Sequence, residues 1–287
     1  MKIDLHIHTR TGSDGNLSVE EVFREASRRK INLMSVTDHD SVDAQTEAIK
    51  LAEAYSITYI TGVELNVNFS LSGGKDVSLD FLGYQYDINN QALRNKLRLM
   101  KEHREARAWQ ILEKLNIGLD NENLTRLTKI DLKQIQGKAD GALGRPHIAD
   151  FLVEKGIVGN RKEAFDRYLV KCDVPKYPLS LAEASKLIRS AGGVIVLAHP
   201  NDPNGTSLVK ITPHPDEQTR IIEKYMLGFI DGAECWHSRN DARTTKHYVR
   251  FARRHGLLMT GGSDCHQKPL LIGTVNIPNY VVAQFRK

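Results

Sequence analysis

Imidazole and carboxylate side chains recur in this sequence at the ends of short apolar segments. His6 and His8 close the first segment, and Asp264 and His266 follow the last one. Because alternate residues of a strand point to the same side, each pair can present two ligands to a single site. The full set of candidate ligands is His6, His8, Asp14, His39, Glu64, Asp80, His199, Asp264 and His266.

This set favours a cluster of two or three divalent metal ions. Nitrogen and oxygen ligands without thiolates suit Mn, Fe or Zn. A single His-x-His pair is more often a hydrogen-bonded part of a core, so one pair alone carries little weight. The whole set carries more, because burying so many ionisable groups without a metal is energetically unfavourable. Three ions sharing these ligands would keep open positions for water and substrate, which a catalytic site needs.

The ligand positions depend on apolar runs that alternate with longer amphipathic segments. Two helix start signals, Ser18 with Glu21 and Ser180 with Glu183, have the spacing of a capping box. This alternation predicts an α/β fold in which helices join the strands of a parallel sheet. The predicted strands are residues 2–7, 33–37, 58–63, 78–83, 194–198, 229–235 and 257–260. In a parallel barrel the carboxyl ends of the strands meet at one rim, which would bring the ligands together.

Residues 91–177 interrupt this pattern. A long charged amphipathic stretch is followed there by short helical patterns without a convincing strand. We expect a helical insertion subdomain at this place and a metal-binding barrel formed by residues 1–90 and 178–287, because insertions in surface loops are entropically cheap. The basic residues within 94–107 alternate with glutamates, which favours a solvated helix face over an oligonucleotide-binding surface.

The composition of the 287-residue chain is that of a globular protein, with 40% hydrophobic and 26% charged residues. No apolar run approaches the length that crosses a bilayer, which excludes a membrane-spanning protein. The three cysteines lie far apart and form no Cys-x-x-Cys pair, so a cytoplasmic location without disulfides is expected. The formal net charge of +5 is too small to single out nucleic acid as a partner.

Four motifs, in order along the chain, resemble those of the polymerase and histidinol phosphatase (PHP) superfamily of metal-dependent phosphoesterases. They are Asp4-Leu5-His6-Ile7-His8 with Ser13-Asp14-Gly15, Thr37-Asp38-His39-Asp40, Ala198-His199-Pro200 and Ser263-Asp264-Cys265-His266. The place of the family's bridging glutamate is matched by Gly62-Val63-Glu64. A further segment, Gly144-Arg145-Pro146-His147, is similar to the branch that dephosphorylates nucleoside monophosphates and 3′,5′-bisphosphates or trims RNA from its 5′ end.

The resemblance implies a distorted seven-stranded (β/α)7 barrel, similar to a TIM barrel, around a trinuclear metal centre. By matching positions, the first ion would be held by His6, His8, Glu64 and Asp264. The second would be held by Asp14, His39 and His266, and the third by Glu64, Asp80 and His199. Relatives usually carry histidine at position 80, and the aspartate of this chain would favour a harder ion.

The resemblance also implies hydrolysis of a phosphomonoester in a nucleotide, such as AMP or a 3′,5′-bisphosphate, or in a short oligonucleotide. The nucleophile would be a hydroxide that bridges the metals, so no side chain is assigned that role. Arg145, His147 and His237 are the candidates for substrate binding. The expected partner is this small phosphorylated substrate, a nucleotide or short RNA, and neither a membrane nor an obligate protein partner is indicated.

Other functions stay open at this point. Within the family, the chain could be a phosphodiesterase acting on a cyclic sugar phosphate or a histidinol-phosphate phosphatase. A non-catalytic, metal-stabilised nucleic-acid-binding module is an alternative from a different class. An amidohydrolase also opens with His-x-His on a barrel strand, but this sequence has no plausible strand-borne lysine for a metal-bridging carbamate.

Overall fold

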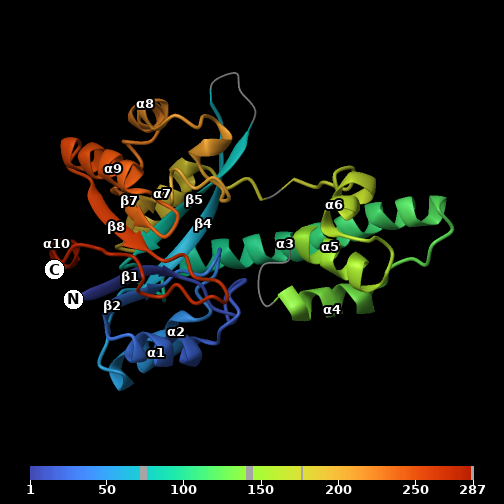
Figure 1. The fold of residues 1–287 in the computed structure, drawn as a ribbon, viewed down its shortest axis with the longest axis horizontal. Helices are drawn as coiled ribbons and strands as arrows, with labels where there is room; N and C mark the ends of the chain where they lie inside the picture. Colours follow the sequence, from blue (N-terminus) through green and yellow to red (C-terminus); the bar gives the residue numbers. More distant parts are fainter. Residues whose placement is uncertain (72–75, 140–144, 176, 286–287) are drawn as a thin grey trace. The chain divides into compact units, whose positions relative to one another are not determined.

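The computed structural model describes residues 1–71, 76–139, 145–175 and 177–285. The chain divides into two compact units, one formed by Met1–Leu97 with Leu179–Lys287 and the other by Arg98–Pro178. Figure 1 shows the course of the chain through both units. The two ends of the chain therefore fold together, and all the predicted metal ligands belong to the unit that they form.

Three parallel strands form the first sheet of this unit. They are β1 (Lys2–Ile7), β2 (Ile31–Val36) and β3 (Thr58–Tyr59), in that order. Helices α1 (Val19–Arg28) and α2 (Gln45–Ala54) join the strands and share their apolar core. The predicted capping box begins α1, because Ser18 Oγ accepts from the Glu21 N–H while the Glu21 carboxylate accepts from the Ser18 N–H.

The second sheet has five strands. In spatial order they are β4 (Gly62–Phe69), β5 (Val77–Tyr84), β6 (Val194–Leu197), β7 (Gly232–His237) and β8 (Leu258–Gly262). Strand β5 runs antiparallel to both β4 and β6, so the prediction of an all-parallel sheet is wrong here. Only residues 70–76 lie between β4 and β5, and so short a connection forms a hairpin rather than a helical crossover.

One predicted strand, residues 58–63, is divided between the two sheets. Strand β3 ends at Tyr59 and β4 begins at Gly62, so the described residues contain eight strands rather than seven. The backbone of Gly62, the first residue of β4, lies close to β2: a Cβ atom there would lie 2.1 Å from Ser35 Oγ and 2.7 Å from the Val36 carbonyl oxygen.

Backbone hydrogen bonds join the two sheets at two places. The Asp264 N–H donates to the His6 carbonyl oxygen (2.8 Å), which links the end of β8 to β1. The Glu64 N–H donates to the Asp38 carbonyl oxygen (3.1 Å), which links β4 to the residues after β2. The α/β class is confirmed, and these two junctions bring the predicted ligands of both sheets together.

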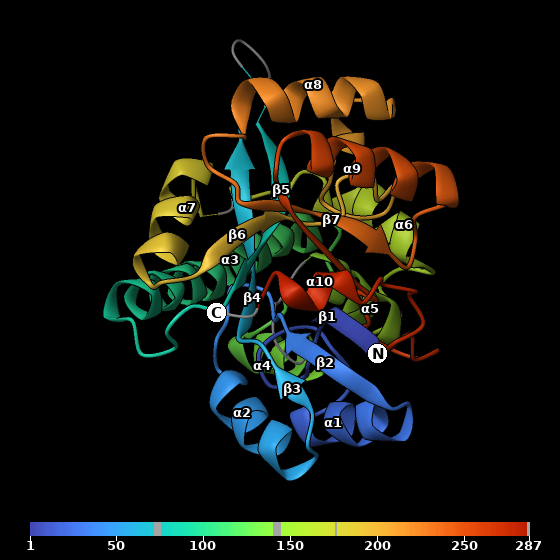
Figure 2. The ribbon, with the colours of Figure 1, turned by 90° about the vertical axis from the view of Figure 1, so that its left-hand side faces the viewer.

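Four further helices accompany the second sheet. They are α7 (Leu181–Ser190), α8 (Pro215–Tyr225), α9 (Ala242–Arg254) and α10 (Tyr280–Ala283). Figures 1 and 2 show α8 and α9 on one side of the strands and α1 and α2 on the other. Within the described residues, no helix combines the length and the apolar character that crossing a membrane requires.

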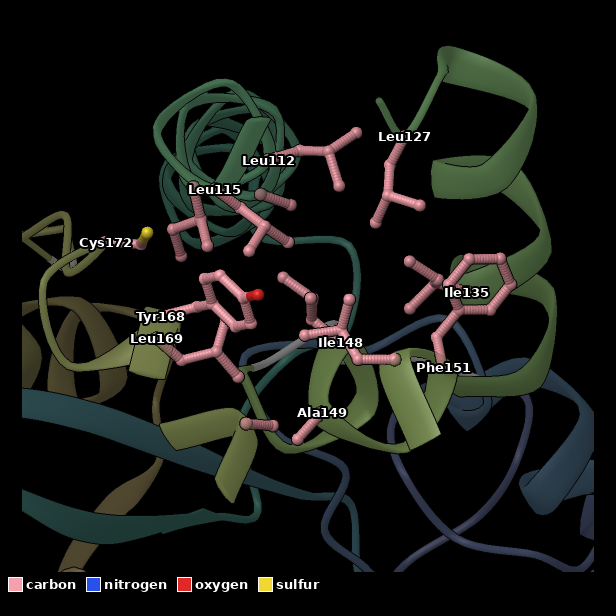
Figure 3. Close-up of a cluster of buried hydrophobic side chains, with 14 of the residues drawn as sticks. Leu112, Leu115, Leu127, Ile135, Ile148, Ala149, Phe151, Tyr168, Leu169 and Cys172 are labelled. Atoms are coloured by element: carbon pink, nitrogen blue, oxygen red, sulfur yellow. The ribbon is translucent and has the colours of Figure 1, made fainter. Parts of the chain in front are cut away.

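The second unit is built from helices. They are the part of α3 (Gln91–Asn121) beyond residue 97, α4 (Lys129–Ala139), α5 (Arg145–Glu154), α6 (Arg161–Ala164) and a π-helical turn at Phe165–Leu169. Figure 3 shows Leu112 and Leu115 of α3 facing Ile148 of α5 and Tyr168. The side-chain amide of buried Asn116 forms hydrogen bonds with both the N–H and the carbonyl group of Leu127, which fixes the segment after α3 against that helix. This unit therefore has a hydrophobic core of its own.

Candidate metal centre

The centre of the site is formed by two histidines of β1 and two carboxylates from distant strands. The Nε2 atoms of His6 and His8 lie 3.1 Å apart. Glu64 Oε2 is 3.3 Å from the first nitrogen and 3.2 Å from the second, and Asp264 Oδ1 is 3.5 and 3.3 Å away. All four side chains are buried. The four ligands predicted for the first ion thus converge on one point.

A second group lies on the His8 side of this point. His266 Nε2 is 3.2 Å and His39 Nε2 is 3.8 Å from Asp14 Oδ1. The imidazole of His266 stacks on that of His8 with ring centroids 3.9 Å apart. His8, Asp14, His39 and His266 can therefore hold a common ion, which adds His8 to the predicted second set.

The third group is formed by His6, Glu64 and His199. His199 Nε2 lies 2.9 Å from Glu64 Oε1. Asp80 Oδ2 is 4.0 Å from the same nitrogen, and Asp80 Oδ1 accepts a hydrogen bond from Asn66 Nδ2 (2.6 Å). The predicted ligand Asp80 is thus next to the group, with one of its oxygens engaged by an amide.

Glu64 tests whether these residues fit metal ions. Its Oε2 atom is buried and is approached at 3.0 to 3.3 Å by nitrogens of His6, His8 and His39. None of these contacts has the geometry of a hydrogen bond. Buried polar atoms normally have hydrogen-bond partners. Nitrogen and oxygen atoms that converge on one point without such hydrogen bonds are arranged as the ligands of a metal ion are. The residues present therefore fit divalent ions.

The charges of the site shift the pKa values of its histidines. Burial alone would lower the pKa of His6, but the carboxylates of Glu234, Glu64 and Asp264 outweigh it and raise the pKa well above the usual value. Burial also opposes protonation of His8, yet the neighbouring carboxylates of Asp264 and Glu64 raise its pKa to about 10.

Two further ligands respond to the same charges. Burial lowers the pKa of His199, but Glu64 outweighs burial and raises that pKa to about 9. Burial would raise the pKa of the Glu64 carboxyl, and the histidines around it instead hold this pKa well below the usual range. The pocket is therefore strongly anionic and attracts cations, protons or metal ions.

We expect the thermal stability of the chelated protein to fall as the pH rises from about 6.5 to about 10. The folded-state pKa values of His8 and His199 exceed the ordinary value of 6.5, so their protonation stabilises the native state below pH 6.5 and is lost as pH approaches 9 to 10. Bound metal replaces these protons and removes this loss. Melting temperatures of chelated and Mn-loaded protein across this range check the prediction, and parallel curves would contradict it.

The candidate ligands are held in place by neighbouring buried carboxylates. Glu234 Oε1 lies 3.1 Å from His6 Nδ1, and Glu234 Oε2 accepts from the His199 N–H (2.8 Å). Glu234 belongs to none of the motifs and was not predicted, although a charged residue inside an apolar run is a signal of such a role. Asp38 is fully buried and accepts hydrogen bonds from Thr9 and Ser13, which orders the loop that carries Asp14.

The predicted substrate-binding residues lie in two places. His237, at the end of β7, is buried, with Nε2 3.4 Å from Asp264 Oδ2, so it borders the candidate metal ligands. Arg145 begins α5 in the helical unit, where its Nη1 lies 3.2 Å from Asp173 Oδ1 and donates to the Leu169 carbonyl. Gly144 of that motif is outside the described residues. A role for Arg145 and His147 at a substrate phosphate stays a prediction.

A sequence model of the PHP domain matches residues 4–171. The chain belongs to the PHP family. The match begins at the residue that opens the first motif and ends within the helical unit. The resemblance that the four motifs indicated is thereby confirmed.

Individual relatives of this PHP protein are similar along most of their length. It is 29% identical over 280 residues to a 5′-3′ exoribonuclease of Haemophilus influenzae, with 92% of this chain and 90% of the relative covered. It is 30% identical over 284 residues to a 3′,5′-nucleoside bisphosphate phosphatase of Chromobacterium violaceum, with 92% and 87% covered. The expected enzyme class, a hydrolase of phosphoester bonds, is confirmed at the level of the family.

Solved structures resemble the PHP fold described here. A Bifidobacterium adolescentis protein described as a metal-dependent phosphoesterase has a TM-score of 0.76 and 28% identity, with 98% of this chain and 94% of that chain covered. A C. violaceum protein described as an amidohydrolase with bound sulfate and no metal has a TM-score of 0.74 and 26% identity, with 98% and 93% covered. The α/β arrangement of this chain is therefore one that its relatives share.

Proposed function

We propose that this chain is a metal-dependent phosphatase that removes a phosphate group from a nucleotide, such as AMP or a 3′,5′-bisphosphate, or from a short oligonucleotide. The observation that carries this proposal is the convergence of His6, His8, Glu64 and Asp264 on one point. Relatives named as a 5′-3′ exoribonuclease and as a nucleoside bisphosphate phosphatase support the substrate class.

The proposal places two or three divalent ions, Mn, Fe or Zn, on three overlapping groups. The groups are His6 with His8 and Asp264, His8 with Asp14, His39 and His266, and His6 with Glu64 and His199. When bound, such ions polarise phosphoryl oxygens and supply an activated water at neutral pH. Because Glu64 faces several of the histidines, it would be shared between ions.

His237 is proposed to contact the phosphate through its Nε2 atom. The Arg239 N–H donates to His237 Nδ1 (3.3 Å), so the ring carries its proton on Nε2, which is directed toward Asp264. An N–H in that position can donate to a phosphoryl oxygen or to the oxygen that leaves.

The proposal for the fold is a ring of seven strands formed by β1, β2 and β4 to β8, with β3 outside it. Its support is the pair of backbone junctions, Asp264 with His6 and Glu64 with Asp38, which join β1 and the end of β2 to the two edge strands of the second sheet. In such a ring, side chains from both sheets can face one site.

Phosphate release from a substrate panel tests the proposed function. The panel is AMP, adenosine 3′,5′-bisphosphate, a short 5′-phosphorylated RNA, a cyclic sugar phosphate and histidinol phosphate, each with added Mn and after chelation. We expect Mn-dependent release from one or more of the nucleotides and RNA. The cyclic substrate is included because a phosphoribosyl 1,2-cyclic phosphate 1,2-diphosphodiesterase of Eggerthella lenta is 26% identical. Release confined to it or to histidinol phosphate, or silence with metal bound, would contradict the proposal.

A further inference from the structure

A fourth group of potential ligands borders the metal centre, and a side chain of the protein already occupies it. The group consists of Asp202, His237 and Asp264, all buried. Arg239 Nη1 lies 2.5 Å from Asp202 Oδ2 and 3.3 Å from Asp264 Oδ2. The guanidinium therefore supplies the positive charge that a metal ion would supply at this position.

Asp202 is a fixed anchor for this guanidinium. Its side chain is only 1% exposed, and its Oδ1 accepts a hydrogen bond from the Asn204 N–H (2.9 Å), so Oδ2 is the oxygen left for Arg239. The backbone of Asp202 is also held by hydrogen bonds. Its N–H donates to the His199 carbonyl, and its carbonyl accepts from Ser207 Oγ. Position and direction of the carboxylate are thus set by the loop after β6.

Arg239 itself is half open to solvent, with 40% of its side chain exposed. Both of its carboxylate contacts use the single atom Nη1. Among the described residues, no partner is recorded for Nε or Nη2. A guanidinium presents its N–H groups as a planar fork that matches two oxygens of a phosphate. The Nη1 atom of the guanidinium is therefore held by the two carboxylates, and its Nε and Nη2 atoms are available to a ligand.

The exposed part of the Arg239 guanidinium lies next to the candidate metal centre. Asp264, whose Oδ2 contacts Arg239, directs its Oδ1 toward the Nε2 atoms of His6 and His8. A phosphate group that reaches these ligands comes within reach of the guanidinium. The long side chain of Arg239 is restrained by Asp202, so less conformational freedom is lost when it takes a phosphate.

We propose that Arg239, anchored by Asp202, binds oxygens of the substrate phosphate at the edge of the metal centre, so that the site favours a terminal, doubly charged phosphate group. This inference rests on the proposed function and adds a residue that the motifs do not contain. Asp202 acts as a positioning residue, since it touches Arg239 and not the phosphate.

The test compares Arg239→Gln and Arg239→Lys with Arg250→Gln, which removes the same charge from an exposed position of α9. Binding of inorganic phosphate is measured by titration calorimetry with chelated and with Mn-loaded protein, and metal content by elemental analysis. We expect Arg239→Gln to weaken phosphate binding about tenfold or more in both forms with unchanged metal content. Arg239→Lys should restore part of this loss, and Arg250→Gln should stay within twofold of the wild type.

Two results would overturn the proposal. Phosphate binding by Arg239→Gln within twofold of the wild type would assign the residue to a purely structural ion pair. Loss of metal from this variant would assign it to support of Asp264. Asp202→Asn removes the anchor and keeps Arg239, so an intermediate loss of phosphate affinity is expected, and wild-type affinity would remove Asp202 from the proposal.

These measurements separate the inference from the proposed function. If the wild type releases phosphate from no substrate of the panel while its phosphate binding depends on Arg239, the proposed function fails and the phosphate site stands. If the wild type is active and Arg239→Gln retains kcat/KM within twofold, the function stands and the inference fails.

Discussion

Replacement of Glu64 by Gln is expected to reduce Mn-dependent phosphate release by more than about a hundredfold. The substitution keeps the shape of the side chain and removes the charge that three histidine nitrogens face at 3.0 to 3.3 Å. Residues that only support metal ligands contribute about 10- to 100-fold, so a shared ligand contributes more. Steady-state rates and metal content per chain, determined on the same preparation, measure the effect.

The chain offers a matched control for this change. Glu223 is a partly exposed glutamate that also lies next to a histidine, 3.0 Å from His255 Nε2. Glu223→Gln should keep both the rate and the metal content, because this pair lies outside the group of ligands. Full activity in Glu64→Gln would refute the assignment of Glu64 to the metal centre.

Replacement of Gly262 by Ala is expected to destabilise the folded chain by about 3 kcal/mol, the upper range for an overpacked core. A Cβ atom at this position would lie 2.3 Å from His6 Cβ and 2.4 Å from the His6 backbone nitrogen. Backbone atoms of β1 cannot rotate away, so β8 and β1 must separate. The shift would also displace His6, and we expect reduced metal content with the loss of stability. Urea unfolding of the chelated protein gives the first quantity and elemental analysis the second.

Gly228 provides the corresponding control. A Cβ atom there would meet nothing within 4 Å. Gly228→Ala should be neutral or slightly stabilising, because alanine restricts the unfolded chain more than glycine. Equal stability of the Gly262 and Gly228 variants would show that β1 and β8 are not in close contact at this place.

The sequence predicted which candidate side chains converge more fully than it predicted the architecture that brings them together. Pairs such as His6 with His8 can be recognised because strand periodicity fixes which side chains share a face. Other candidates, such as His39 and Asp264, lie within short local motifs, so they could be recognised without knowledge of the sheet order. The fold class followed from alternating strands and helices for the same reason.

Other features depend on pairing between distant segments. Periodicity describes β5 as a strand but contains no information on its direction, which the connection at residues 70–76 determines. Glu234 and Arg239 stand outside recognisable motifs. The register of β7 places Glu234 against His6, and the loop after β7 places Arg239 against Asp202. Long-range register of this kind cannot be derived from a single sequence.

The junction of β1 with β8 has a consequence for the order of events during synthesis. His6 and Asp264 are joined through the Asp264 N–H, although 258 residue positions separate them. Loop closure over such a span is entropically expensive and slow, and a growing chain cannot complete it before its last strand has left the ribosome. The helical unit, whose core is local in sequence, can fold earlier. The complete set of candidate ligands is therefore expected to assemble late, after synthesis, and a chain truncated before β8 would keep the N-terminal candidate ligands and lack Asp264 and His266.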